Sequence, residues 1–306
     1  MITTRSFFAA AVWLVSTSAA LAQGTITSGT TSLQFVGTPF TTGTGNANLF
    51  FGSTSAFGTD QLFRYGWAYN QGVGTSTRPF STLDTPGQGY SGNVATLTWG
   101  GAGAGVAGFA RWDAVLTITL TEIAPTLVST QPGSARVDSV LRFTASAGNA
   151  AAINFNLFHD LDFDIIGTAA NNAANDVYRI VDAASATGIA GRAFDTTSSN
   201  YAEFIGAGAQ RYEFNTGAAL RTKLGNTSGT GTGNLATPAG TGVADWASTD
   251  GAVAFQWSPT LSAGQSVTIS TSYTMNAAVA AIPEPSSWAL MAVGVLALTG
   301  LARRRA

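Results

Sequence analysis

The 306-residue chain has no cysteine, one histidine and few charged residues. Without cysteine there can be no disulfide bond and no thiolate metal ligand, so stability must come from burial and backbone hydrogen bonds. Charged residues make up 10% of the chain, against about 25% in an average soluble protein. The 18 Phe, 7 Trp and 7 Tyr residues nevertheless supply material for a packed core. Low charge therefore does not indicate disorder, which usually combines high net charge with few aromatic residues.

Basic residues are also scarce outside the two ends of the chain. Removing Arg5 and Arg303 to Arg305 from the 14 Lys and Arg residues, and Glu284 from the 16 Asp and Glu, leaves 10 basic and 15 acidic residues. The densest basic cluster in this body is "RTK" at 221–223. Because nucleic-acid binding draws on many phosphate contacts, the sequence predicts no nucleic-acid partner.

The N-terminus resembles a secretory signal in its order of parts. Arg5 supplies a positive charge, an apolar stretch follows from Phe7 to Val15, and Ala20-Leu21-Ala22 forms a small-residue cleavage pattern. These features predict a signal peptide over residues 1–22, removed by signal peptidase during export. The alternative is a buried core helix. It is disfavoured because the apolar stretch starts close to the N-terminus and is followed by a peptidase cleavage pattern.

The body, residues 23–280, alternates apolar and polar residues with a period of two. The clearest run is "ARWDAVLTITL", in which Trp112, Leu116 and Leu120 point one way and Asp113 and Thr117 the other. Similar runs are "LFRYGWAY", "RVDSVLRFTA", "INFNLF", "VYRIVD", "AQRYEFN", "VAFQW" and "QSVTISTSYTMN". One apolar face per strand is typical of antiparallel sheets packed on a single core. The predicted class is all-β, an antiparallel β-sandwich or jelly roll of around ten strands.

Turn-forming clusters separate these runs, among them "TPGQGYSGN", "STQPGSA", "NTSGTGTGN" and "SPTLSAGQ". Longer surface loops are expected at 24–32, 41–48 and 225–242. Besides the two terminal apolar segments, only "TAANNAAND" has helical character. The run "GAGAGVAG" fits the dinucleotide-binding spacing G-x-G-x-x-G, but a β-periodic segment follows it instead of a helix. It is interpreted as a hairpin loop.

The segment "FHDLDFDIIG" carries the most acidic cluster. On an extended strand Asp160, Asp162 and Asp164 would share one face, about 7 Å apart, and would repel one another unless hydrated or neutralised. Calcium is a natural candidate in an exported acidic chain, with Asp176 as a further ligand, although the EF-hand glycine and glutamate positions are not matched. The alternative is a solvated acidic strand end with no metal.

No catalytic residues are predicted. His159 is the sole histidine, and no G-x-S-x-G elbow accompanies it, so neither a Ser-His-Asp triad nor a multi-histidine zinc site is indicated. A glycosidase needs only two carboxylates, which leaves that option open. Several aromatic side chains could stack on sugars if exposed, or form core if buried: Tyr65, Trp67, Tyr69, Tyr90 and Trp99.

The C-terminus, residues 281–306, has three consecutive parts. Pro283-Glu284-Pro285 enforces an extended backbone, and residues 286–302 form an uncharged, mostly apolar run at the short end of the length range for a membrane-spanning helix. Arg303, Arg304 and Arg305 follow, and positive charge beside a span favours the cytoplasmic side. The predicted topology places the body outside and the arginines inside.

These three parts resemble the PEP-CTERM sorting domain of Gram-negative bacteria. The resemblance covers about 26 residues and implies recognition by an exosortase, with processing near Pro283-Glu284-Pro285. It further implies a transient inner-membrane anchor, a final place at the cell surface or in the matrix, and an association with exopolysaccharide and biofilm. The stretch "LFHDLDFDIIGTAANNAAND" is also loosely similar to a segment common in such proteins.

The sequence thus predicts an exported surface or matrix protein with a structural or adhesive body that is not an enzyme. The alternatives are a calcium-dependent carbohydrate-binding module and a glycan-active hydrolase. No ligand of the body and no oligomeric state is indicated.

Overall fold

The fold was analysed in a computed structural model. It describes residues 24–35, 47–51, 61–72, 76–80, 87–102, 110–124, 133–165, 176–183, 188–196, 200–225, 233–242, 244–248 and 251–277. The predicted signal peptide and the whole C-terminal segment lie outside this part of the chain.

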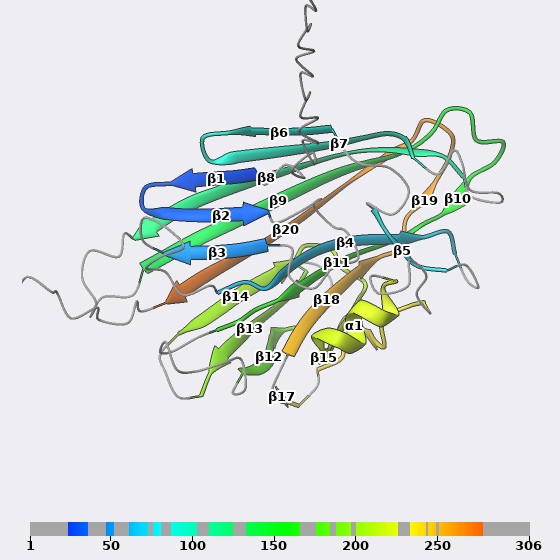
Figure 1. The fold of residues 1–306 in the computed structure, drawn as a ribbon. Coiled ribbons are helices and arrows are strands. Elements are labelled where there is room, and N and C mark those ends of the chain that lie inside the picture. Colours follow the sequence, from blue (N-terminus) through cyan, green and yellow to red (C-terminus); the bar gives the residue numbers. More distant parts are fainter. Residues whose placement is uncertain are drawn as a thin grey trace, which may run out of the picture.

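A nine-stranded antiparallel sheet forms one layer, in the order β17-β12-β13-β14-β20-β9-β8-β7-β6 (Figure 1). The strands are β6 (Gly87–Ser91), β7 (Val94–Ala102), β8 (Trp112–Ala124), β9 (Gly133–Ala145), β12 (Asp176–Asp182), β13 (Ile189–Asp195), β14 (Tyr201–Gly206), β17 (Trp246–Ser248) and β20 (Ser266–Ala277). Its centre is built on the long β8, β9 and β20, which pair along most of their length.

The smaller sheets lie across one face of this layer (Figure 1). A six-stranded sheet has the order β16-β15-β18-β11-β4-β5, a three-stranded sheet contains β1-β2-β3, and β10 pairs with β19. Their strands are β1 (Gly24–Ser28), β2 (Thr31–Phe35), β3 (Ala47–Phe51), β4 (Arg64–Asn70), β5 (Arg78–Pro79), β10 (Ile153–Asn154), β11 (Asn156–Asp162), β15 (Arg211–Thr216), β16 (Thr237–Pro238), β18 (Gly251–Trp257) and β19 (Thr260–Leu261).

The core between the layers is rich in aromatic side chains. Three tryptophans are fully buried in it: Trp67 of β4, Trp99 of β7 and Trp112 of β8. They belong to one continuous cluster that contains residues from all three larger sheets. Phe80 links the layers, because its ring centroid lies 5.3 Å from that of Trp99 and 4.8 Å from that of Trp112. Such ring pairs add to the stabilisation from area burial.

The central strands of the six-stranded sheet are buried on both faces. Every residue of β4, β11 and β18 is buried. A second apolar cluster covers the outer face, where Leu220 of helix α1 (Gly217–Lys223) and the C-cap residue Leu224 lie with Phe158. The helix begins where the Thr216 hydroxyl accepts a hydrogen bond from the backbone N–H of Ala219 at 3.2 Å, a common way to start a helix.

The all-β prediction is confirmed, and the inward set of "ARWDAVLTITL" is buried as expected. There are more strands than the ten expected, because weakly periodic segments also pair. Residues 24–32, expected as a loop, form most of the β1–β2 hairpin, and "GQGYS", expected as part of a turn, is strand β6. Helix α1 was not predicted. These elements depend on tertiary contacts more than on local periodicity.

His159 of β11 lies inside the aromatic core. Its ring stacks on Trp67 with centroids 4.4 Å apart and meets the ring of Tyr65 edge-on at 4.7 Å. Neither ring nitrogen has a hydrogen-bond partner among the described residues. Burial lowers the pKa of His159 to about 3, so the imidazole is neutral in the folded protein at neutral pH.

This burial makes stability depend on pH in a predictable direction. Between pH 6.5 and 3 the unfolded chain protonates His159 and the folded chain does not, so the free energy of unfolding falls as the pH falls. Relative to His159→Phe, the wild type should lose about 3 kcal/mol between pH 6.5 and 4. Urea unfolding followed by tryptophan fluorescence at several pH values measures the difference. A difference that does not change with pH would contradict the prediction.

Candidate functional site

The acidic strand does not end in solvent. Asp160 and Asp162 share a face of β11 as predicted, but this is the covered outer face of the six-stranded sheet, and both side chains are almost fully buried. The Arg64 guanidinium lies 2.5 Å from a carboxylate oxygen of Asp160, and Arg221 of α1 lies 3.5 Å from Asp162. The chain therefore supplies its own cations to two of the three predicted calcium ligands.

The side chains of Arg64, Asp160 and Asp162 are almost fully shielded from water. Burial lowers the pKa of Arg64, and the charges of Asp160 and Asp162 partly offset that effect. A buried ion pair contributes little net stability, but removal of one partner leaves an uncompensated charge and is strongly destabilising. We therefore assign Asp160 and Arg64 a structural role beneath α1.

The third predicted calcium ligand, Asp164, follows the end of β11 and is half-buried. It contributes to the electrostatic environment of Asp176, the first residue of β12, as do Asp162 and Asp195. Asp176 is 1% exposed, and neither carboxylate oxygen makes a hydrogen bond of ordinary geometry with a described residue. Burial raises the pKa of Asp176 to about 8, with smaller contributions from the neighbouring carboxylates and an opposing one from the Ile165 backbone N–H. The side chain is therefore mainly protonated at neutral pH.

The described part of the chain contains no group of three or more His, Asp or Glu side chains that could hold a metal ion. Residues 166–175, which follow the acidic strand, are outside that part. Calcium binding at Asp160, Asp162 and Asp164 stays a prediction.

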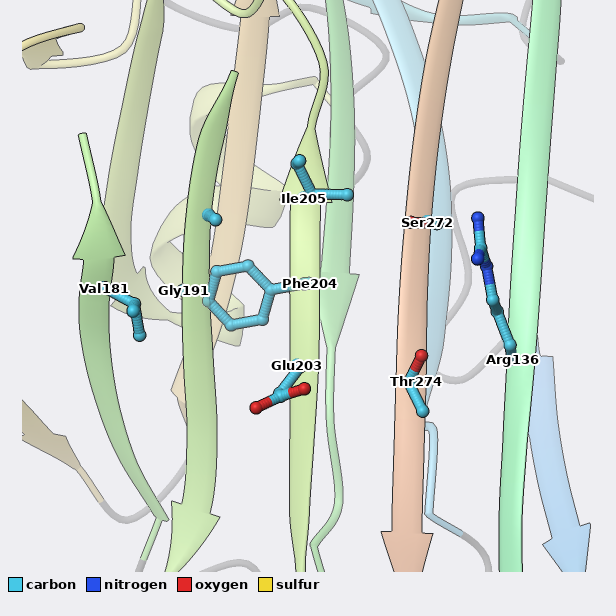
Figure 2. Close-up of a pocket in the computed structure, with 9 residues that line it drawn as sticks. Arg136, Val181, Gly191, Glu203, Phe204, Ile205, Ser272 and Thr274 are labelled. Carbon is cyan, nitrogen blue, oxygen red and sulfur yellow. The ribbon is translucent and has the colours of Figure 1, made fainter. Parts of the chain in front are cut away.

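The exposed face of the nine-stranded sheet carries a trough of about 280 Å³. Figure 2 shows side chains from β12, β13, β14, β20 and β9 along it. The register explains the arrangement, because Glu203 lies opposite Thr274, and Thr274 lies opposite Arg136. One transverse row thus presents a carboxylate, a hydroxyl and a guanidinium across adjacent strands.

A second row makes the trough amphipathic. Val181 at the end of β12 is 68% exposed, and Ile205 of β14 lies opposite Ser272 of β20. Ala190 of β13, which lies opposite Ile205, sits between them. On the other face of the sheet a Cβ at Gly191 would lie 2.5 Å from the ring of Phe204, so glycine there allows this ring to pack closely in the core beneath the trough.

The charged groups of the trough are already oriented by neighbours. Glu203 pairs with Arg192 of β13, and Arg136 lies 2.6 Å from Asp138 on its own strand. All four side chains remain at least one-third exposed, so these pairs are accessible to ligand and contribute little to stability. The trough therefore offers charged hydrogen-bonding groups beside apolar side chains, a combination common in small-molecule sites.

The sugar-stacking aromatics considered from sequence are mostly core. Tyr65, Trp67, Tyr69 and Trp99 are fully buried, while Tyr90 is half-buried. Sequence periodicity did not identify the trough, because its residues are distant in the chain and meet only through strand pairing. The tail motif also lies outside the described residues, none of which form a helix long and apolar enough to cross a membrane.

The Asp176 environment gives a second pH prediction, opposite in sign to that of His159. From about pH 4 to 8 the unfolded chain ionises this carboxyl while the folded chain keeps it protonated, so its burial destabilises the fold increasingly as pH rises. Asp176→Asn should gain stability over wild type across that interval, at up to about 1.4 kcal/mol per pH unit. Urea unfolding measures this, with Asp182→Asn, an exposed position on the same strand, as control. Parallel profiles for wild type and Asp176→Asn would refute it.

Solved structures share the fold at very low sequence identity. A galactose mutarotase related enzyme from Lactobacillus acidophilus matches with a TM-score of 0.54 and 4% identity, covering 85% of this chain and 99% of its own. A putative aldose 1-epimerase from Escherichia coli matches with a TM-score of 0.48 and 8% identity, covering 83% and 98%. No curated protein sequence matches the chain.

The first of these likenesses shows the fold alone, but it overturns one expectation. The sequence predicted a body that is not an enzyme, whereas the fold found for the body is one that an enzyme also uses. A family model gives the remaining result, since the PEP-CTERM protein-sorting motif matches residues 281–305. The chain therefore carries a C-terminal PEP-CTERM sorting segment, as expected for an exosortase substrate.

Proposed function

We propose that the protein belongs to the bacterial surface or the exopolysaccharide matrix, and that its β body binds a glycan at the trough. Export would begin with removal of residues 1–22 by signal peptidase. An exosortase would then process the chain near Pro283, Glu284 and Pro285 while residues 286–302 hold it in the inner membrane and Arg303 to Arg305 stay inside. The sorting motif at residues 281–305 is the observation that carries the proposal.

The trough supports the glycan part. Its carboxylate, guanidinium and hydroxyl groups can accept and donate hydrogen bonds to sugar hydroxyls, and Val181 and Ile205 can contact the apolar face of a sugar ring. The name of the galactose mutarotase related enzyme makes sugars the first ligands to test.

A glycan-active enzyme is the second candidate, favoured by carboxylates on the exposed sheet face and by the enzyme among the structural neighbours. His159 could not act as its base, because the ring is buried in the core. Any acid-base chemistry would use carboxylates such as Glu203 and Asp138.

Processing at the motif is tested by the mass of the exported protein. In a strain with an exosortase, the recovered wild-type protein should lack both its N-terminal signal and its C-terminal segment. Replacing Pro283, Glu284 and Pro285 by alanine should leave the tail attached, because the extended recognition segment is lost. The matched control is Ser286→Ala with Ser287→Ala, which should be processed as wild type. Processing at the motif would be rejected if the triple variant and the wild type had the same C-terminal cleavage.

Glycan binding is tested with exopolysaccharide fractions of the producing organism in affinity electrophoresis. Glu203→Gln and Arg136→Gln should each weaken retention about tenfold, because each removes a charge-assisted hydrogen bond. Arg142→Gln, on the same strand and face as Arg136 but outside the trough, should bind as wild type. Equal retention of all four proteins would contradict the trough as the site. Release of reducing ends, abolished by Glu203→Gln, would identify the enzymatic alternative.

A further inference from the structure

The ends of the two large sheets are not equally protected. A sheet edge exposes unpaired backbone N–H and C=O groups and invites pairing with another chain. The edges of the six-stranded sheet are β5 and β16, each two residues long and each containing a proline, Pro79 or Pro238. One edge of the nine-stranded sheet is β17, only three residues long and preceded by Asp245, which pairs with Arg179. Short strands, proline and charge are the usual means of blocking an edge.

The fourth edge, β6, has none of these protections. It is five residues long, "GQGYS", with no charge and no proline. It pairs with β7 in an unbroken register from Gly87↔Thr98 to Ser91↔Val94, without a bulge that would turn it away. No described residue pairs with its other side. The hairpin over residues 87–99 carries no charged side chain.

The glycines of β6 are not demanded by the fold itself. Neither Gly87 nor Gly89 has a positive φ. A Cβ at Gly87 would come no closer than 3.7 Å to another atom, and one at Gly89 no closer than 4.0 Å. Side chains would therefore fit at both positions. The effect of these glycines is on the sheet edge, because without side chains they leave the backbone N–H and C=O groups of β6 accessible to another strand.

We propose that β6 is an assembly edge, where it pairs antiparallel with β6 of a second copy about a two-fold axis at Gly89. Antiparallel pairing is the arrangement that a two-fold axis generates, and a self-complementary patch needs no other partner. Gln88 would then lie opposite Tyr90 of the second copy, and Gly87 opposite Ser91. No like charges would meet in this strand pair, although the body carries a net negative charge. The two nine-stranded sheets would become one continuous sheet, and the troughs would stay open because they lie over β9, β20, β14, β13 and β12.

Sedimentation of the exported protein, purified from producing cells, tests the assembly. Wild type should form dimers as concentration rises. Gly89→Lys should raise the dimer dissociation constant at least tenfold, because two ammonium groups would face each other across the axis. Thr98→Lys, also exposed but on β7, adds the same charge one strand inside the edge and should dimerise as wild type. A monomeric wild type, or a Gly89→Lys variant that dimerises equally well, overturns the proposal.

Cross-linking gives a second test that does not require the lysine variant to fold. The chain has no cysteine, so Gly89→Cys introduces the sole thiol. Residues directly opposite in an antiparallel pair have Cα atoms about 4.5–5.5 Å apart, within the range a disulfide spans. Gly89→Cys should therefore form a disulfide-linked dimer under mild oxidation, while Ser91→Cys, displaced from the axis, should do so far less. Absence of the Gly89→Cys dimer, or equal cross-linking of both variants, rejects the register. Pairing of β6 with a different strand of a second copy would appear as an oligomer that Gly89→Cys does not cross-link, and it would also reject the proposal.

Discussion

Contacts between aromatic rings hold the two sheet layers of this protein together. Without disulfides and with few charges, the chain must hold its two layers together by burial and ring contacts. Phe80, Trp112 and Phe143 form a continuous stack, with Trp112 and Phe143 centroids 5.0 Å apart. His159 lies within the same layer and is kept neutral by it. The single residue most often associated with catalysis is therefore part of the core.

Because aromatic rings fill the core between the sheets, most charged side chains lie on the outer faces of the two sheets. Their roles differ between these two faces. Behind the six-stranded sheet, α1 covers Asp160 and Arg64, which neutralise each other out of water. On the outer face of the nine-stranded sheet no described residue covers the strands, so Glu203 and Arg136 remain accessible. Carboxylate and guanidinium groups are therefore structural on the outer face of the six-stranded sheet, which α1 covers. On the outer face of the nine-stranded sheet the same groups are available to a ligand, because no described residue covers it.

Sorting and body function are separate properties of this chain. The PEP-CTERM segment lies at residues 281–305 and determines a route, whereas the trough and the β6 edge belong to the sandwich. The proposed assembly edge and the proposed glycan site lie on one sheet, and pairing through β6 would present two troughs on one continuous surface, as would suit a matrix protein. Multivalent presentation of this kind raises avidity without a new contact.

The all-β class, the inward faces of the regular strands and the sorting segment could all be predicted from the sequence. Each of these rests on local order: a period of two along "ARWDAVLTITL", or three consecutive parts at the tail. Three features became visible only in the folded chain: the burial of Asp160, the pairing of "GQGYS" as an edge strand, and the placement of Glu203 and Arg136 in one row across three strands. These depend on which strands pair and which faces are covered, and contacts between residues so distant in the chain leave no periodic signal in it.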